Sequence, residues 1–106
     1  MIREFIRYNA FLKPALKLLG EKGIEQLQKE LSDNPEAGAL IRGGGGLRKY
    51  RAALPGRGKS GGARLIYYYY VTGQQCYLFY LYPKNERENI SADDVKAYAK
   101  IIAEIK

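Results

Sequence analysis

The chain has 106 residues, enough for one domain over residues 1–106, and 18 lysine and arginine residues against 11 aspartate and glutamate residues give it a net charge of +7. The absence of histidine excludes Ser-His and Cys-His nucleophiles and zinc sites built on imidazole, and the single cysteine excludes an intramolecular disulfide. A basic chain with one cysteine, no apolar run of membrane-spanning length and no signal peptide is expected to be cytoplasmic and to bind a polyanion.

The first third of the chain predicts one strand and two helices. Residues 2–8 have the pattern of a short strand, and residues 11–19 carry apolar side chains at helical spacing. Pro14 implies that this helix begins no earlier than about residue 10, because proline is tolerated only in the first turn of a helix. A second helix carries apolar residues on one face over residues 24–31 and ends before Pro35, since the residue before a proline disfavours the helical conformation.

The middle of the chain predicts a loop followed by three strands. The loop spans residues 38–46 and contains four consecutive glycines. Strands are expected over residues 47–54, 62–71 and 75–82, joined by a basic, glycine-rich connection at 55–61 and a tight turn at 72–74.

The last element is a helix that begins after Ser91, because a serine followed three residues later by Asp94 is a capping-box pattern. The order βααβββα indicates an α+β domain with a small, largely antiparallel sheet, two N-terminal helices and a C-terminal helix. We expect these helices to pack on one face of the sheet.

The whole net charge belongs to one segment of the chain. Seven basic residues and no acidic residue lie between positions 42 and 64, and the rest of the chain is neutral with eleven of each. The seven are Arg42, Arg48, Lys49, Arg51, Arg57, Lys59 and Arg64. A localised excess predicts a surface for phosphate groups, with a solvated basic loop as the alternative.

Three of these cations are expected to converge. Side chains alternate along a strand, so Lys49 and Arg51 share one face, and Arg64 lies on the next strand. If the two strands pair, the cations repel one another unless an anion bridges them, which favours a phosphate site over a solvated strand face. Tyrosines are available to stack on bases beside this cluster: Tyr68, Tyr70, Tyr80 and Tyr82.

The segment Gly56-Arg57-Gly58-Lys59-Ser60 resembles the end of a nucleotide-binding P-loop. The P-loop pattern requires glycine at position 53, where this chain has alanine, and a helix after the loop, where a strand is predicted. We therefore expect either a basic loop that contacts phosphate through Arg57 and Lys59 or a flexible hairpin connection.

Several segments together resemble the HigB branch of the RelE/ParE toxin superfamily over almost the whole chain. They are PEAG at 35–38, GGGGLRKYR at 43–51, GKSGGARLIYY at 58–68 and YPKNE at 82–86 before the terminal helix. The resemblance implies a RelE-like fold and the toxin of a type II toxin–antitoxin pair. Such toxins are ribosome-dependent endoribonucleases that cleave mRNA in the ribosomal A site and are silenced by an antitoxin.

The resemblance also implies roles for residues. Arg64 matches the arginine of the family's central strand and would stabilise the transition state, and Lys49 is the candidate general base. Asn85 stands where RelE has an arginine and Ser91 stands near an expected tyrosine, so the general acid stays open among Lys59, Lys84, Tyr68 and Tyr70. The predicted catalytic residues are Lys49, Arg51, Arg64 and Lys84, and the predicted RNA contacts are Arg48, Arg57, Lys59, Tyr68, Tyr70, Asn85 and Glu86.

No metal or cofactor is expected, because the RNA's own 2′-hydroxyl can attack the adjacent phosphate with help from a base, an acid and cations. The expected partners are the ribosome, mRNA and a cognate antitoxin, a helix-turn-helix protein through which alone the toxin would reach operator DNA. The alternatives are a ParE-like toxin that inhibits DNA gyrase without cleaving RNA, and a non-catalytic RNA-binding module.

Overall fold

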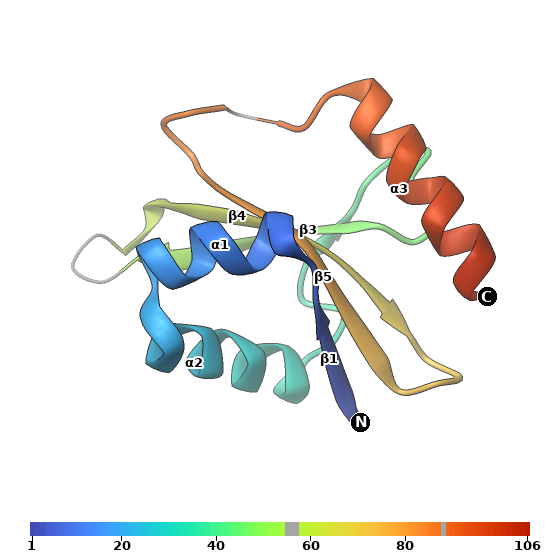
Figure 1. The fold of residues 1–106 in the computed structure, drawn as a ribbon, viewed down its shortest axis with the longest axis horizontal. Coiled ribbons are helices and arrows are strands. Elements are labelled where there is room, and N and C mark those ends of the chain that lie inside the picture. Colours follow the sequence, from blue (N-terminus) through green and yellow to red (C-terminus); the bar gives the residue numbers. More distant parts are fainter. Residues whose placement is uncertain (55–57, 88) are drawn as a thin grey trace.

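A five-stranded sheet with helices on both faces forms the centre of the computed structural model, which describes residues 1–54, 58–87 and 89–106. In chain order the elements are β1 (Glu4–Arg7), α1 (Asn9–Leu18), α2 (Gly20–Asp33), β2 (Ala39–Leu40), β3 (Arg48–Leu54), β4 (Gly58–Tyr70), β5 (Gln75–Pro83) and α3 (Ala92–Ile105) (Figure 1). The α+β class and the order of the predicted elements are confirmed, and β2 is an additional strand.

The strand order in the sheet is β1-β5-β4-β3-β2. β1 pairs with β5 in parallel, and the other three pairs of strands are antiparallel, as the expected largely antiparallel sheet requires. β4 is therefore the central strand, and its side chains contribute to the hydrophobic clusters on both faces of the sheet.

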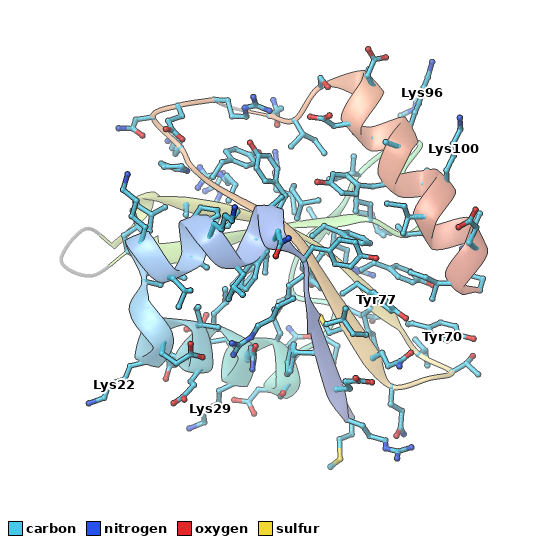
Figure 2. The ribbon with its side chains drawn as sticks, viewed as in Figure 1. Lys22, Lys29, Tyr70, Tyr77, Lys96 and Lys100 are labelled. Atoms are coloured by element: carbon cyan, nitrogen blue, oxygen red, sulfur yellow. The ribbon has the colours of Figure 1, made fainter. Side chains whose placement is uncertain are left out.

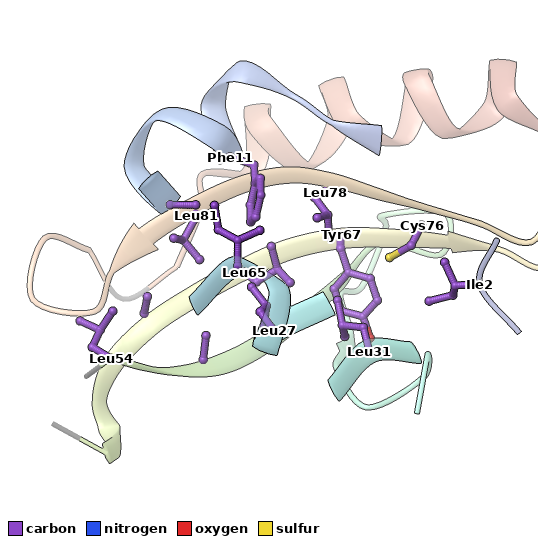
Figure 3. Packing of buried hydrophobic residues seen from close by; sticks show 14 residues of the cluster. Ile2, Phe11, Leu27, Leu31, Leu54, Leu65, Tyr67, Cys76, Leu78 and Leu81 are labelled. Atoms are coloured by element: carbon purple, nitrogen blue, oxygen red, sulfur yellow. The ribbon is translucent and has the colours of Figure 1, made fainter. Parts of the chain in front are cut away.

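The helices pack on both faces, so the expectation of helices on one face is wrong. Leu65 and Tyr67 of β4 belong to the cluster beneath α1 and α2, which Figure 3 shows with Phe11, Leu27 and Leu31. The alternate residues of β4 belong to a second cluster with Ile102 of α3. The reason lies in β4 itself, which is apolar on both faces and needs cover on each.

β2 forms where the sequence predicts only loop. It pairs with β3, with Ala39 opposite Lys49. Just before it, the Gly38 N–H donates to the Tyr67 hydroxyl at 2.9 Å, and the Gly38 carbonyl accepts from Arg48 Nη1 at 2.7 Å. These contacts join residues ten or more positions apart, and a two-residue strand leaves no alternation of side chains that the sequence could show.

The connection between β3 and β4 is shorter than predicted. β4 starts at Gly58, with Leu54 opposite Gly58, so residues 58–61 belong to the strand. Glycine weakens the strand signal in a sequence, but pairing with β3 supplies the hydrogen bonds that define the strand here.

The sequence predicts that Pro14 lies in the first turn of its helix. In the structure it lies deeper, inside α1. The helix starts at Asn9, so the proline removes one backbone hydrogen bond, at a cost of up to about 3 kcal/mol. Phe11 and Ala15 on either side of it are fully buried against the sheet, and this packing offsets the loss.

The start of α3 agrees with the prediction, since the Ser91 hydroxyl accepts a hydrogen bond from the Asp94 N–H at 3.0 Å. Within the described ranges, no helix has the length and apolar character needed to cross a membrane.

Candidate active site

Cations from neighbouring strands meet on the face of the sheet that packs against α3. Arg51 of β3 lies directly opposite Arg64 of β4, and Arg64 lies directly opposite Tyr82 of β5. Lys49 lies two residues before Arg51 on β3 and therefore shares its face. The strand register thus brings together the three predicted cations, and we call the surface formed by Lys49, Arg51, Arg64 and Tyr82 the basic face.

Arg64 is the one buried charged residue in the part of the chain that the structure describes, with 3% of its surface exposed. The hydrogen bond of its guanidinium is local and weak: Nη1 donates to the carbonyl of the preceding residue, Ala63, at 3.4 Å. The ion pairs among the described residues involve other arginines, so no described carboxylate lies within 4.0 Å of Arg64. A buried cation without a counter-ion is unfavourable in the free protein and favours binding of an anion.

Lys49 is held by a residue far along the chain. Its Nζ donates to the Asn89 Oδ1 at 2.6 Å. The two side chains line a hollow of about 320 Å³ with residues 39–41, Ile90 and Val95. Asn89 could not be found from the sequence, because no sequence motif indicates that the segment before α3 returns to β3.

Arg87 is a further cation that sequence reasoning missed. Its guanidinium carbon lies 5.8 Å from the ring centroid of Tyr80 and 5.9 Å from that of Tyr82, within the range of a cation–π contact. Its Nη1 is 3.7 Å from a carboxylate oxygen of Asp94. The sequence does show two tyrosines at alternate positions of β5 followed by a charged turn, which is consistent with a cation–π contact. The path of the turn decides which of its charged side chains reaches the rings.

The predicted residues of the turn after β5 lie at the same end of the sheet as Arg64. The Lys84 N–H donates to the Gly62 carbonyl at 3.1 Å, which extends the β4–β5 pairing by one residue beyond Pro83. Asn85 and Glu86 are exposed, and Glu86 lines a second hollow, of about 470 Å³, with residues 80–83 and the start of α1.

Arg48 lies on the other face of the sheet from Lys49. Its Nη1 donates to the carbonyls of Gly38 and Glu36 at 2.7 and 3.2 Å, and its Nη2 lies 3.8 Å from the Glu36 carboxylate. These contacts fix the segment before β2, so Arg48 is not part of the basic face.

Tyr68 and Tyr70 share the face of Arg64 but lie away from it. Six residues of extended strand place Tyr70 about 20 Å from Arg64. Tyr68 is 6% exposed, and its ring stacks at 6.4 Å on Tyr70, which Figure 2 shows with Tyr77 toward the outer end of the β4–β5 ribbon. The tyrosines beside Arg64 are instead Tyr80 and Tyr82. Of the other predicted contacts, Arg57 and the side chain of Lys59 lie outside the described residues.

Cys76 takes no part in this site. It is fully buried in the cluster beneath α1 and α2, and burial raises the pKa of its thiol from 9.0 to about 12. The thiolate needed for nucleophilic attack is therefore suppressed.

Comparison with known proteins relates the whole arrangement to one family. A family model described as the RelE toxin of the RelE/RelB toxin–antitoxin system matches residues 21–106. A similar solved structure is that of a mutant of the E. coli toxin RelE in the free state, in which two arginines are replaced by alanine. The two sequences are 24% identical, and the alignment covers 96% of this chain and 98% of the RelE chain. The TM-score of 0.57 shows a shared fold.

Proposed function

The chain belongs to the RelE toxin family, and we propose that it inhibits translation by cleaving mRNA on the ribosome with the basic face. Membership makes it the toxin of a toxin–antitoxin system with an antitoxin as its partner. The observation that carries the proposed site is Arg64, a buried cation without a described counter-ion opposite a second arginine. A phosphodiester placed there would satisfy both arginines at once.

The chemistry suited to these residues is transfer of the phosphoryl group to the RNA's own 2′-oxygen. A base removes the proton of the 2′-hydroxyl while the 2′-oxygen forms a bond to phosphorus. The bond from phosphorus to the 5′-oxygen breaks, and an acid delivers a proton to that oxygen. The products are a 2′,3′-cyclic phosphate and a 5′-hydroxyl, and the reaction needs no water, metal or cofactor.

Each step has a candidate residue. Lys49 is the proposed base, since it projects from β3 on the same face as Arg51. Arg64 and Arg51 hold the non-bridging oxygens and stabilise the charge that develops on them in the transition state. Lys84 is the proposed proton donor to the 5′-oxygen, because it follows the partner of Arg64 on β5 by two residues.

The RNA chain on either side of the reacting phosphate would contact the rest of this end of the sheet. Tyr80 is half-buried next to the cation of Arg87 and offers aromatic surface suited to an unstacked base, whereas Tyr82 is 2% exposed and packs against Tyr80 with ring centroids 5.2 Å apart. Asn85 and Glu86 are exposed in the adjacent turn and provide polar groups for base edges.

Within the family we propose the HigB branch, on the glycine-rich and basic motifs at 43–51 and 58–68. The antitoxin is then a helix-turn-helix protein that also carries the complex to operator DNA. Action on ribosome-bound mRNA implies that the protein works in the cytoplasm.

Expression of the protein followed by primer extension on cellular mRNA tests the proposal. We expect discrete cleavage sites in translated messages, and a loss of at least about 100-fold in cleavage for Arg64→Ala, the effect of removing one transition-state donor. Lys29→Ala is the matched control, because Lys29 points away from α2 into solvent (Figure 2). Purified ribosomes carrying mRNA should support cleavage, whereas the same RNA alone should not.

The chemistry is tested by the ends of the fragments. A 5′-hydroxyl allows direct labelling by a polynucleotide kinase without prior phosphatase treatment, and we expect this result. Fragments with 5′-phosphate ends would contradict attack by the 2′-hydroxyl. Intact transcripts in cells poisoned by the protein would contradict the ribonuclease proposal as a whole and favour a gyrase-inhibiting toxin.

A further inference from the structure

Lys49 and Asn89 are 40 residues apart in the sequence and are joined by the 2.6 Å hydrogen bond from Nζ to Oδ1. Asn89 belongs to the segment between β5 and α3, whereas Lys49 lies on β3. The bond therefore ties the start of the last helix to the strand that carries the proposed base. The sequence motifs assign no function to Asn89.

The neutral character of this acceptor distinguishes Lys49 from arginines nearby. Arg87 is 3.7 Å from the carboxylate of Asp94, and Arg48 is 3.8 Å from that of Glu36. Lys49 has no carboxylate within 4.0 Å among the described residues, and its hydrogen bond goes to an amide oxygen.

Among the residues that the structure describes, the charged groups around Lys49 on the same face of the strands are cations. Arg51 lies two residues along β3, and Arg64 lies opposite Arg51 on β4. β2 places the uncharged Ala39 opposite Lys49. The first turn of α3 holds two acids, of which one pairs with Arg87 and the other, Asp93, is exposed.

An ammonium group on a flexible four-carbon chain needs an acceptor to stay in one place. A carboxylate would hold it but would also favour the charged form, which opposes its use as a base. An amide oxygen holds it and adds no charge. The same amide keeps its NH₂ group as a donor, which the hydrogen bond to Lys49 does not use.

We propose that Asn89 is a positioning residue, which holds the Lys49 amine at the basic face through a neutral acceptor. The inference rests on the proposed function of Lys49 as the base. It assigns Asn89 a part in the reaction that no sequence motif indicates.

The test compares Asn89→Asp and Asn89→Ala with the wild type in single-turnover cleavage of mRNA on purified ribosomes between pH 6 and 10. Asn89→Asp keeps the size of the side chain and adds a negative charge beside the amine. We expect the rising limb of the pH–rate profile to move up by about 1 pH unit, so that the rate on that limb falls about tenfold.

Asn89→Ala removes the acceptor without adding charge. We expect a rate about tenfold lower across the whole range, with the rising limb in its wild-type position. Asn34→Asp is the matched control, because Asn34 follows α2, is exposed and lies outside the basic face; its profile should equal that of the wild type. An unshifted limb in Asn89→Asp, or a wild-type rate in Asn89→Ala, would overturn the inference.

A second measurement separates this inference from the proposed function. Side-chain ¹⁵N NMR follows the titration of the Lys49 amine in the free protein, with Lys49→Arg used to assign the signal. Asn89→Asp should move this titration to higher pH, and Asn34→Asp should leave it in place. An active ribonuclease without these shifts would contradict the role of Asn89 alone, whereas a protein with the shifts but without cleavage would contradict the proposed function alone.

Discussion

Replacing Arg64 with methionine should stabilise the free protein and abolish cleavage. Arg64 is 3% exposed and lies directly opposite Arg51, and no described carboxylate is within 4.0 Å of it. Replacing buried charged groups by apolar groups of similar volume is neutral or stabilising, by about 1–4 kcal/mol in the most favourable cases. We expect the free energy of unfolding of Arg64→Met to rise by about 2 kcal/mol.

Arg51 contributes the repulsive partner. Like charges directly opposite across antiparallel strands destabilise a sheet by roughly 0.2–1 kcal/mol, and Arg51 is exposed, which places it toward the lower half of this range. Arg51→Gln should therefore gain about 0.5 kcal/mol in the wild type and nothing once Arg64 is methionine. The double variant should be less stable than the sum of the single effects by about 0.5 kcal/mol.

Urea unfolding of the four proteins at low salt measures this cycle, and thermal unfolding gives an independent reading. A gain of about 2 kcal/mol corresponds to a rise in Tm of about 10 °C for a domain of this size. Inorganic phosphate should raise the Tm of the wild type, because it binds the folded state between the arginines, and should not raise that of Arg64→Met.

The opposite result would refute the reasoning. A loss of more than about 1 kcal/mol in Arg64→Met would show that the fold depends on the guanidinium. If phosphate also failed to stabilise the wild type, the basic face would not be an anion site, and the assignment of Arg64 to transition-state stabilisation would fail with it.

Tyr67→Phe should lower the free energy of unfolding by about 2–4 kcal/mol in urea unfolding, because the hydroxyl accepts from the buried Gly38 N–H at 2.9 Å and donates to a backbone carbonyl at 2.8 Å; a loss below about 0.5 kcal/mol would contradict it. Ser91→Ala should cost about 1 kcal/mol through the lost cap, whereas Ser91→Asp should keep most of the stability. Burial raises the pKa of Cys76 from 9.0 to about 12, so the folded state keeps a proton that the unfolded state loses. Stability should therefore fall as pH rises from about 9 to 12, and Cys76→Ala should flatten that slope in unfolding measured against pH; equal slopes would count against it.

Local patterns in the sequence predicted most of the fold. Apolar spacing indicated both N-terminal helices, and the run of β-branched and aromatic residues indicated the central strand. Ser91 and Asp94 marked the start of α3 because capping is decided within four residues. These features can be predicted from the sequence because the interactions that create them are short-range.

Features that depend on contacts between distant residues could not be predicted from the sequence. β2 exists through contacts of residues 38–40 with β3 and Tyr67, and Pro14 is accommodated inside α1 because its neighbours are buried against the sheet. Helices on both faces follow from the packing of α3 over the second apolar face of β4. Each of these depends on the energy of burial in the assembled domain, which no window of the sequence contains.

The same division applies to the site. The sequence by itself determined that the net charge lies in one segment and that Lys49 and Arg51 share a face of one strand, because side chains alternate along a strand. Only the tertiary structure decided that Arg64 lies opposite Arg51 and is buried with no described carboxylate within 4.0 Å, and that Arg87 and Asn89 approach the basic face, because the loop before α3 must return across the sheet to bring them there.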